Sequence, residues 1–298
     1  MKKFEQEVIN SILKDYDSGI CISKLCTKYH TTLIREILIQ NNRKVPEKRT
    51  CGGSKRKYTL NENYFENIDS KDKAYFLGFI YADGFITKRK QGQNILGITL
   101  AEDEPLKKIS KYIDSNKPIG IYKKVNGYSE KSYEHKLAFV SNKLVSDIEK
   151  LGVVERKTLI LTFPKFLKPE FIPHFIRGYF DGDGSVFLHK GSHKDKERYY
   201  LGINICGTEE FLIELKNNLP FLTDQDKCIY KELRRETNCW NLKLASNLRS
   251  LNLYHFMYKD CDDLYLSRKK KIFEDYIKDK GSETIIDIPT NDLMWLEE

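Results

Sequence analysis

Two acidic residues carry the strongest chemical signal in this sequence, because each of them closes the same short phrase. Residues 76–84 read FLGFIYADG and residues 176–184 read IRGYFDGDG, so that Asp83 and Asp183 stand one hundred residues apart, each directly before a glycine. An internal repeat of this kind predicts a duplicated structural unit. If the fold brings the two carboxylates together, they repel each other and either share a proton or bind a metal ion.

The two phrases predict a pair of closely packed helices that end at these aspartates. Small residues recur at a four-residue step, as Gly78 and Ala82 in the first phrase and as Gly178 and Gly182 in the second. Residues four apart share one helix face, and a face without bulk lets two backbones approach closely. We expect the glycine after each aspartate, Gly84 or Gly184, to end its helix in the left-handed conformation. The aspartate then lies at the negative end of the helix dipole, where a carboxylate needs a compensating cation.

The residues after each phrase predict the same succession of elements twice. In the first copy we expect strands at 85–90 and 94–100, a helix at 105–113, strands at 118–124 and 135–141, and a helix at 142–151. In the second copy we expect strands at 185–190 and 200–206, a helix at 209–219, strands at 228–234 and 240–245, and a helix at 246–258. The letters LGIT at 96–99 recur as LGIN at 201–204, which supports this register. Each copy therefore reads as helix, two strands, helix, two strands, helix.

The repeated phrase and the order of its elements resemble the LAGLIDADG homing endonucleases, in the single-chain form that carries two motifs. The resemblance covers roughly residues 71–278. It implies an α+β fold in which two αββαββα repeats, related by a pseudo-twofold axis, pack through their first helices and form a DNA-binding saddle. It places the first repeat at 71–166 and the second at 167–279, and leaves a C-terminal tail at 280–298 without an assigned role.

The resemblance also implies a metal-dependent reaction at the paired aspartates. Asp83 and Asp183 are the predicted catalytic metal ligands, and the backbone carbonyls of Ala82 and Gly182 are expected to add further ligands. Mg²⁺, or another divalent cation such as Mn²⁺, prefers oxygen ligands and keeps several waters, so two protein carboxylates suffice. Metal ions that flank an in-line displacement activate water and neutralise charge at phosphorus.

The sixth position of the motif differs between the copies, with Tyr81 in the first and Asp181 in the second. In the family this position usually faces away from the metal. We therefore expect the metal site to be intact despite the difference.

The resemblance also implies a basic residue near the scissile phosphate, late in each repeat. The dipeptide Arg-Lys at 156–157 recurs at 268–269, so Lys157 and Lys269 are predicted to stabilise transition-state charge or to orient water. Lys136 and Lys243, on predicted strands, are the alternatives. A lysine in any of these places can also be a solvated surface charge.

The two sheets are expected to lie in the major groove, one on each half of the target. Alternation along a strand points about half of its side chains toward the DNA, where basic side chains read base edges or bind phosphates. The candidates on or beside the predicted strands are Lys88, Lys90, Lys123, Lys124, Lys190, His193, Lys231, Arg234 and Arg235.

Residues 1–45 predict a small helical domain that is similar to a helix-turn-helix. Apolar spacing indicates a helix near 4–16, a second at 23–29 and a third that begins after Thr31 and Thr32 and runs through 39. Its last helix would enter the major groove, with Thr31, Thr32, Arg35 and Gln40 as candidate contacts. The alternative is a three-helix packing or dimerisation module. Residues 46–70 are a basic linker that we expect to contact phosphates.

Composition agrees with a nucleic-acid partner and with a reducing compartment. Lys and Arg number 51 against 43 Asp and Glu, giving a net charge of +8 that favours a polyanion. Seven cysteines show no metal-binding spacing, which predicts reduced thiols in a cytoplasmic protein, or an organellar one in a eukaryotic host. No segment predicts a membrane span or a secretion signal.

The resemblance, taken with these features, implies a monomeric endonuclease that cuts both strands of a long, asymmetric double-stranded DNA site and leaves short 3′ overhangs. It would be intron-encoded or free-standing, and we expect no intein, because splicing needs a nucleophile at the first residue and a terminal Asn, whereas these ends are Met1 and Glu298. The alternative is a non-cleaving RNA maturase or DNA-binding regulator on the same scaffold. The retained aspartate pair favours cleavage.

Overall fold

The computed structural model describes residues 6–45, 57–89, 92–123, 133–193, 196–232 and 238–280. The chain divides into two compact units, residues 1–57 and residues 58–298. Each unit has a hydrophobic core of its own, and Tyr64 and Phe65, which were predicted to lie in the linker 46–70, are buried in the core of the second unit. Among the described residues, no helix combines the length and the apolar character that crossing a membrane requires.

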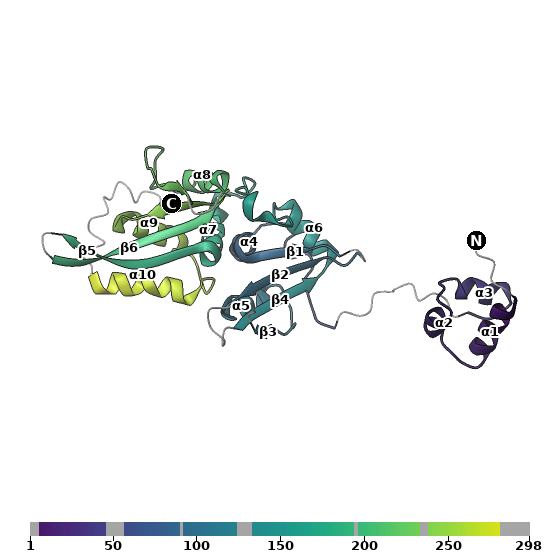
Figure 1. Cartoon of the computed structure of the whole chain (residues 1–298). Coiled ribbons are helices and arrows are strands. Elements are labelled where there is room, and N and C mark those ends of the chain that lie inside the picture. The colour runs from purple at the N-terminus through teal and green to yellow at the C-terminus, as the bar shows by residue number, and fades with distance from the viewer. Residues whose placement is uncertain are drawn as a thin grey trace. The chain divides into compact units, whose positions relative to one another are not determined.

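The first unit is a group of three short helices, drawn in purple in Figure 1. They are α1 (Gln6–Asp17), α2 (Ile22–Lys28) and α3 (Ile34–Gln40). One apolar side chain from each of α1 and α2, Ile12 and Leu25, is fully buried against Ile34 and Leu38 of α3. The helices lie close to the three predicted ranges, while their use as a helix-turn-helix on DNA stays a prediction.

The second unit contains the predicted repeat twice, and the α+β fold class is confirmed. The first repeat consists of α4 (Lys71–Asp83), β1 (Gly84–Thr87), β2 (Ile95–Leu100), α5 (Glu104–Tyr112), β3 (Gly120–Lys123), β4 (Tyr133–Val140) and α6 (Asn142–Lys150). The second consists of α7 (Ile172–Asp183), β5 (Gly184–His193), β6 (Lys196–Gly207), α8 (Glu209–Asn217), β7 (Ile229–Lys231), β8 (Trp240–Leu244) and α9 (Asn247–Tyr258), and α10 (Ser267–Lys280) follows it. Two 3₁₀ turns, η1 (Lys157–Leu159) and η2 (Pro169–Phe171), lie between α6 and α7.

Both repeats build the same antiparallel sheet. The strand order is β1-β2-β4-β3 in the first sheet and β5-β6-β8-β7 in the second. Alternation decides which face is covered, since Leu201, Ile203 and Ile205 of β6 are buried while Asn204 between them is partly exposed. The buried faces of both sheets belong to one continuous core, so the two repeats form a single body.

Helices α4 and α7 lie side by side between the two sheets (Figure 1) and meet at their small residues. A Cβ atom on Gly78 would lie 2.0 Å from the carbonyl oxygen of Phe175, and one on Gly178 would lie 1.9 Å from that of Tyr75. Nearer the helix ends, a Cβ on Gly182 would lie 2.3 Å from the Cβ of Ala82. The predicted close packing through small faces is confirmed.

The prediction that Gly84 and Gly184 adopt the left-handed conformation is wrong. Their φ angles are −72° and −89°, with ψ of 150° and 159°, because each helix passes directly into a strand. Glycine is needed there for space instead. A Cβ on Gly84 would lie 2.6 Å from the carbonyl oxygen of Ile80, and one on Gly184 would lie 2.5 Å from that of Phe180.

Candidate active site

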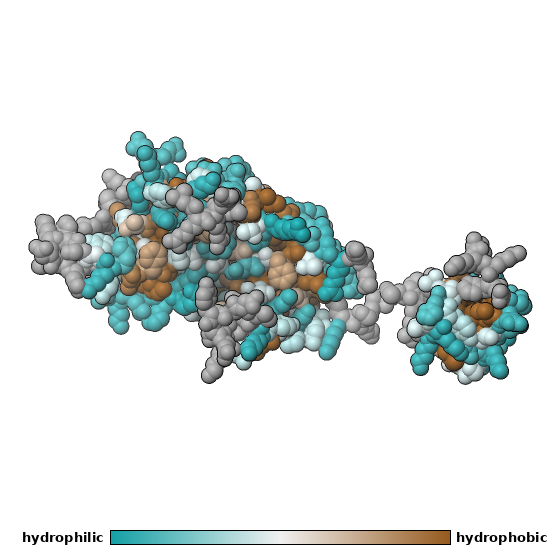
Figure 2. Space-filling model, in the orientation of Figure 1, coloured by the Kyte–Doolittle hydropathy of each residue, from teal (hydrophilic) through white to brown (hydrophobic). Residues whose placement is uncertain are grey.

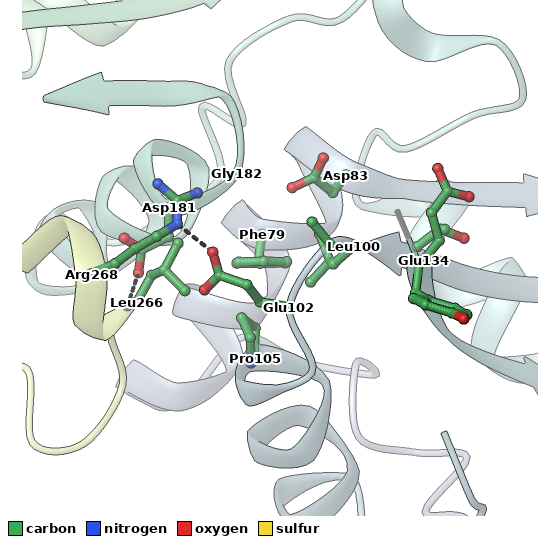
Figure 3. Close-up of a pocket in the computed structure, with 13 residues that line it drawn as sticks. Phe79, Asp83, Leu100, Glu102, Pro105, Glu134, Asp181, Gly182, Leu266 and Arg268 are labelled. Carbon is green, nitrogen blue, oxygen red and sulfur yellow. Dashed lines mark hydrogen bonds and ion pairs between the residues drawn. The ribbon is translucent and has the colours of Figure 1, made fainter. Parts of the chain in front are cut away.

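The packing of α4 against α7 brings the two motif aspartates to neighbouring helix ends. Asp83 is the last residue of α4 and Asp183 is the last residue of α7. The carboxylate of Asp83 lies against the partner helix, since a Cβ on Gly182 would be 2.8 Å from its Oδ2 atom. Figure 3 shows the Asp83 side chain on the side of α4 that faces Gly182.

Protein atoms partly shield both carboxylates from water, and this shielding raises the pKa of each. Burial, and then the negative charge of Asp183, raises the pKa of Asp83 to about 6. Reduced hydration also raises the pKa of Asp183, although its side chain keeps contact with solvent. Such a pair favours either a bound proton or a bound cation, because both relieve the repulsion.

Lys157 and Lys269 supply the positive charge at this place, and neither is a surface lysine. Their exposed fractions are 7% and 3%. The Lys157 ammonium donates to the carbonyl oxygen of Ala82 at 2.6 Å. The Lys269 ammonium donates to the carbonyl oxygens of Phe180 and Asp181 at 2.7 Å and of Gly184 at 2.5 Å, with Gly182 at 3.3 Å.

These bonds place one ammonium group at the C-terminal end of each motif helix, which compensates the helix dipole. Burial lowers the pKa of Lys269 to about 8 and also lowers the pKa of Lys157. The aspartates oppose this effect in both cases, because a neighbouring negative charge favours the protonated amine.

Two cavities flank the aspartates, and each combines side chains from both repeats. A cavity of about 250 Å³ holds Asp183 together with Lys157 and Tyr179. A second cavity, of about 330 Å³, holds Asp83 together with Gly182 and with Arg268 from the start of α10 (Figure 3). The site is therefore composite, since each aspartate shares its cavity with residues of the other repeat.

Several residues of these cavities were not predicted from the sequence. Glu102, in the connection between β2 and α5, forms an ion pair of 2.5 Å with Arg268 across the repeats (Figure 3). The Tyr179 hydroxyl donates to the carbonyl oxygen of Cys206 at 2.8 Å and lies within hydrogen-bonding reach of Asp183. The first motif has Phe79 at the corresponding position. This difference between the two copies is the sequence feature that could have identified Tyr179 as a residue of the site.

The differing sixth motif positions both bind backbone inside the core. The Tyr81 hydroxyl donates to the carbonyl of Leu151. Asp181 is 2% exposed, and its Oδ2 accepts from the Tyr75 hydroxyl and from the backbone N–H of Leu266, both at 2.8 Å. Burial raises the pKa of Asp181 to about 6. Asp181 lines the Asp83 cavity, but its bonds tie α7 to α4 and to the segment before α10.

The alternative lysines lie on the strands. Lys136 of β4 has its ammonium 5.0 Å from the centroid of the Phe85 ring, and Lys243 of β8 has its ammonium 5.9 Å from that of Tyr230. Neither lines the two cavities that hold the aspartates.

The predicted DNA contacts are distributed over both units. In the first unit Thr32 and Gln40 are exposed, Arg35 is half-buried, and the Thr31 hydroxyl accepts from the N–H of Leu33 at 3.2 Å. In the second unit the exposed candidates with described side chains are Lys88, Lys123, Lys190 and Lys231, of which Lys88 forms an ion pair of 2.7 Å with Glu149. Lys90, Lys124, Arg234, Arg235 and the side chain of His193 lie outside the described residues. Figure 2 shows polar residues in teal over much of the face in view, with apolar residues in brown between them.

The donor set at the helix ends fits a hard divalent cation. It consists of the two carboxylates and of the carbonyl oxygens of Ala82 and Gly182, which accept from lysine but keep a second lone pair. Oxygen donors with room for waters suit Mg²⁺ or Mn²⁺. Within the described ranges no group of three or more His, Cys, Asp or Glu residues could hold a metal ion.

No protein-family model matches the chain. Among curated proteins, the DNA-directed RNA polymerase subunit Rpo1C of Methanocaldococcus jannaschii is 31% identical over 116 residues, a match that spans 39% of this chain and 13% of that protein.

Solved structures of the homing endonuclease I-WcaI, the meganuclease I-SmaMI and the LAGLIDADG meganuclease I-AabMI show similarity to the chain. I-WcaI bound to its DNA recognition sequence is 15% identical, with a TM-score of 0.47 over 71% of this chain and 91% of that one. I-SmaMI bound to uncleaveable DNA is 13% identical, with a TM-score of 0.45 over 70% and 90% of the two chains. I-AabMI bound to uncleaved DNA is 15% identical, with a TM-score of 0.43 over 68% and 87%.

Proposed function

We propose that this chain is a site-specific double-strand DNA endonuclease of the LAGLIDADG homing type, acting as a monomer. The observation that carries the proposal is the placement of Asp83 and Asp183 at adjoining helix ends, with a buried lysine at each end. Paired carboxylates with raised pKa values beside buried cations are typical of catalytic sites. The repeated motif supplies the family resemblance independently of this geometry.

The proposed reaction is hydrolysis of one phosphodiester in each strand. A divalent cation held by Asp83 and Asp183 would supply charge neutralisation at the phosphate and an activated water. The chain itself holds the two carboxylates at a fixed spacing, since bulk at Gly78, Gly178 or Gly182 would force the helices apart. In preorganised sites of this kind, aligned charges stabilise the transition state without reorganising.

The two lysines have different roles in this proposal. An ammonium group has three N–H bonds, and Lys269 uses that capacity on the carbonyls of Phe180, Asp181 and Gly184, so it positions the end of α7 as a fixed cation. Lys157 makes one such bond, to Ala82. Its remaining N–H groups can bind a phosphate oxygen or a water, so Lys157 is the stronger candidate for stabilising transition-state charge.

The proposed substrate is double-stranded DNA with a long, asymmetric target. Exposed lysines on the strands, among them Lys190 and Lys231, belong to sheets that would follow the major groove. Lys231 has an equivalent in the first repeat, Lys123, since each ends the letters IYK, whereas Lys88 corresponds to Leu188, so the two halves of the target would differ in part. The family resemblance suggests short 3′ overhangs, and the basic linker and the amino-terminal helices would lengthen the contact.

The test begins with mapping cut sites of the wild-type protein on a random-sequence DNA library in Mg²⁺. Asp83→Asn and Asp183→Asn each remove one carboxylate charge at constant size, so double-strand cutting should fall at least about 100-fold while DNA binding persists. The matched control is Asp114→Asn, an exposed aspartate with a φ of 52° that Asn tolerates.

Cutting and binding are measured on the same DNA, by plasmid linearisation and by gel shift. If either aspartate variant cut DNA as fast as the wild-type protein does, the proposed mechanism would be wrong. Binding without any cutting by the wild-type protein would identify the alternative, a non-cleaving protein on the same scaffold.

A further inference from the structure

Two thiol groups lie side by side next to the Asp183 cavity. The sulfur atoms of Cys206 and Cys239 are 3.5 Å apart. Cys206 belongs to β6, where it pairs with Asn241 of β8, and Cys239 directly precedes β8. Cys239 is thus two residues from the position opposite Cys206, a diagonal arrangement on one face of the sheet that brings side chains within reach of each other.

Both cysteines line the same cavity as Asp183 and Lys157. Each is partly exposed, so small reagents in solvent can reach the sulfur atoms through that cavity. A reagent that reaches the cysteines also reaches the proposed catalytic groups.

Each cysteine is one hydrogen bond away from a segment that holds a group of the site. The carbonyl oxygen of Cys206 accepts from the Tyr179 hydroxyl at 2.8 Å, and this hydroxyl lies beside Asp183. On the other side, Asn238 precedes Cys239 and its side-chain amide donates to the carbonyl oxygen of Leu159 at 3.3 Å. Leu159 ends the 3₁₀ turn that begins with Lys157.

The first repeat has no equivalent thiol on its corresponding strand. The match of 201–204 with 96–99 aligns Cys206 with Ala101, which lines the cavity of Asp83. A chemical modification of the cysteine pair would therefore affect the half of the site that contains Asp183.

We propose that Cys206 and Cys239 are a reversible modification site, at which oxidation forms a disulfide that slows the Asp183 half of the site. The effect on DNA rests on the proposed function, whereas formation of the bond does not. With a low-molecular-weight disulfide as the oxidant, one cysteine thiolate attacks it and releases one thiol. The second cysteine then displaces the other thiol, so two S–H groups become one S–S bond and two thiols leave.

Formation of the bond repositions and then fixes the two cysteine side chains. A disulfide places its sulfur atoms roughly 2.05 Å apart, so the present 3.5 Å must shorten by roughly 1.5 Å. The bond then ties β6 covalently to the segment before β8, and it restrains Tyr179 and Leu159, beside Asp183 and Lys157, through the hydrogen bonds of Cys206 and Asn238. The oxidised protein should nick one strand faster than it completes the double-strand cut.

The first experiment detects the bond. Full-length protein is treated with oxidised glutathione, remaining thiols are blocked with iodoacetamide, and a tryptic digest is analysed by mass spectrometry. The expected result is a peptide pair cross-linked through Cys206 and Cys239 that disappears after dithiothreitol. Alkylation of both residues at the oxidant concentration that modifies the exposed Cys21 would overturn the proposal.

The second experiment follows a supercoiled plasmid that carries the mapped target. Oxidised wild-type protein should accumulate nicked circles and linearise the plasmid at least about 10-fold more slowly than reduced protein, with recovery after dithiothreitol. Cys239→Ser should cut at one and the same rate before and after oxidation, and the control Cys21→Ser should respond to oxidation like the wild type.

The outcomes separate the two proposals. A reduced protein that never cuts refutes the proposed function, while the cross-linked peptide still decides whether the bond forms. A cross-linked protein that linearises DNA at the reduced rate refutes the effect on the site.

Discussion

Asp181 illustrates how a motif residue can serve the architecture of the site. Its carboxylate accepts from Tyr75 of α4 and from the N–H of Leu266, which precedes α10. Those bonds hold the start of α10, and with it Lys269, against the end of α7. Tyr81 occupies the same motif position in the first repeat and binds the carbonyl of Leu151, directly after α6. Both residues thus connect a motif helix to the last helix segments of a repeat.

The raised pKa of Asp181 predicts that the stabilities of the wild-type protein and of an Asp181 variant differ by an amount that depends on pH. Burial raises its pKa in the folded protein from the ordinary 3.8 to about 6, so the folded state binds the proton more tightly than the unfolded state. This contribution to stability is present below about pH 4 and is lost as the pH rises through about 6. Asp181→Asn carries no charge, so its free energy of unfolding relative to the wild type should rise by about 1 to 3 kcal/mol between pH 4 and pH 6.5.

Urea unfolding of both proteins across this range, without divalent cations, measures the difference. The comparison cancels the contributions of other carboxylates, such as Asp15 and Asp17, whose pKa values their salt bridges lower. A constant difference between the two proteins would mean that Asp181 is ionised throughout the range or already protonated throughout it.

At the scale of elements, the crossing of α4 and α7 determines where the aspartates lie. Gly78 and Gly178 meet backbone carbonyl oxygens of the facing helix, and backbone atoms cannot turn aside as a side chain does. The aromatic rings around the crossing, such as Tyr81 edge-on to Phe175 at 5.0 Å, fill the space beside it. Any separation of the two helices moves the two carboxylates apart as well.

Gly78→Ala should therefore destabilise the protein and reduce cutting together. The added Cβ would lie 2.0 Å from the oxygen of Phe175, and overpacking against backbone costs about 3 kcal/mol or more. Both the urea unfolding midpoint and the DNA cutting rate of the variant are measured and compared with those of the wild type.

Gly97→Ala is the matched control for this substitution. Its Cβ would lie 2.3 Å from the Phe85 ring, which belongs to a partly exposed side chain and can rotate. The change in the free energy of unfolding should stay within about 1 kcal/mol. Equal losses in both variants would contradict the assignment of the crossing as the rigid contact.

At the scale of the molecule, the chain has two units with separate cores. The first unit buries its apolar side chains among its own three helices, and the core of the second begins at Tyr64. Removing the first unit therefore leaves the core of the second complete.

Deletion of residues 1–45 should weaken DNA binding without stopping the cutting of a short core site. A protein that neutralises fewer phosphates releases fewer counterions, so the slope of log Kd against log salt concentration should fall by about 0.9 for each phosphate that the shortened protein leaves unbound. Binding titrations at several salt concentrations measure this slope, and thermal unfolding checks that the second unit is intact. An unchanged footprint on DNA would make the amino-terminal helices a packing or dimerisation module.

The sequence by itself determined the repeat, the order of its elements and the small faces of the two motif helices. These features are local, because helix and strand periods and small-residue spacing are visible within short windows. The duplication adds a check, since each copy confirms the register of the other, as LGIT and LGIN do in the second strand position.

Only the tertiary structure decided which distant residues meet. It buried Lys157 and Lys269 at the helix ends, joined Glu102 to Arg268, and brought Cys206 beside Cys239. It also placed Gly84 and Gly184 in extended backbone, where the space beside the helix demands glycine. Apart from the crowding of Gly84 and Gly184 by residues four positions earlier, these contacts join residues that are 33 or more positions apart, and no short window of sequence contains both partners.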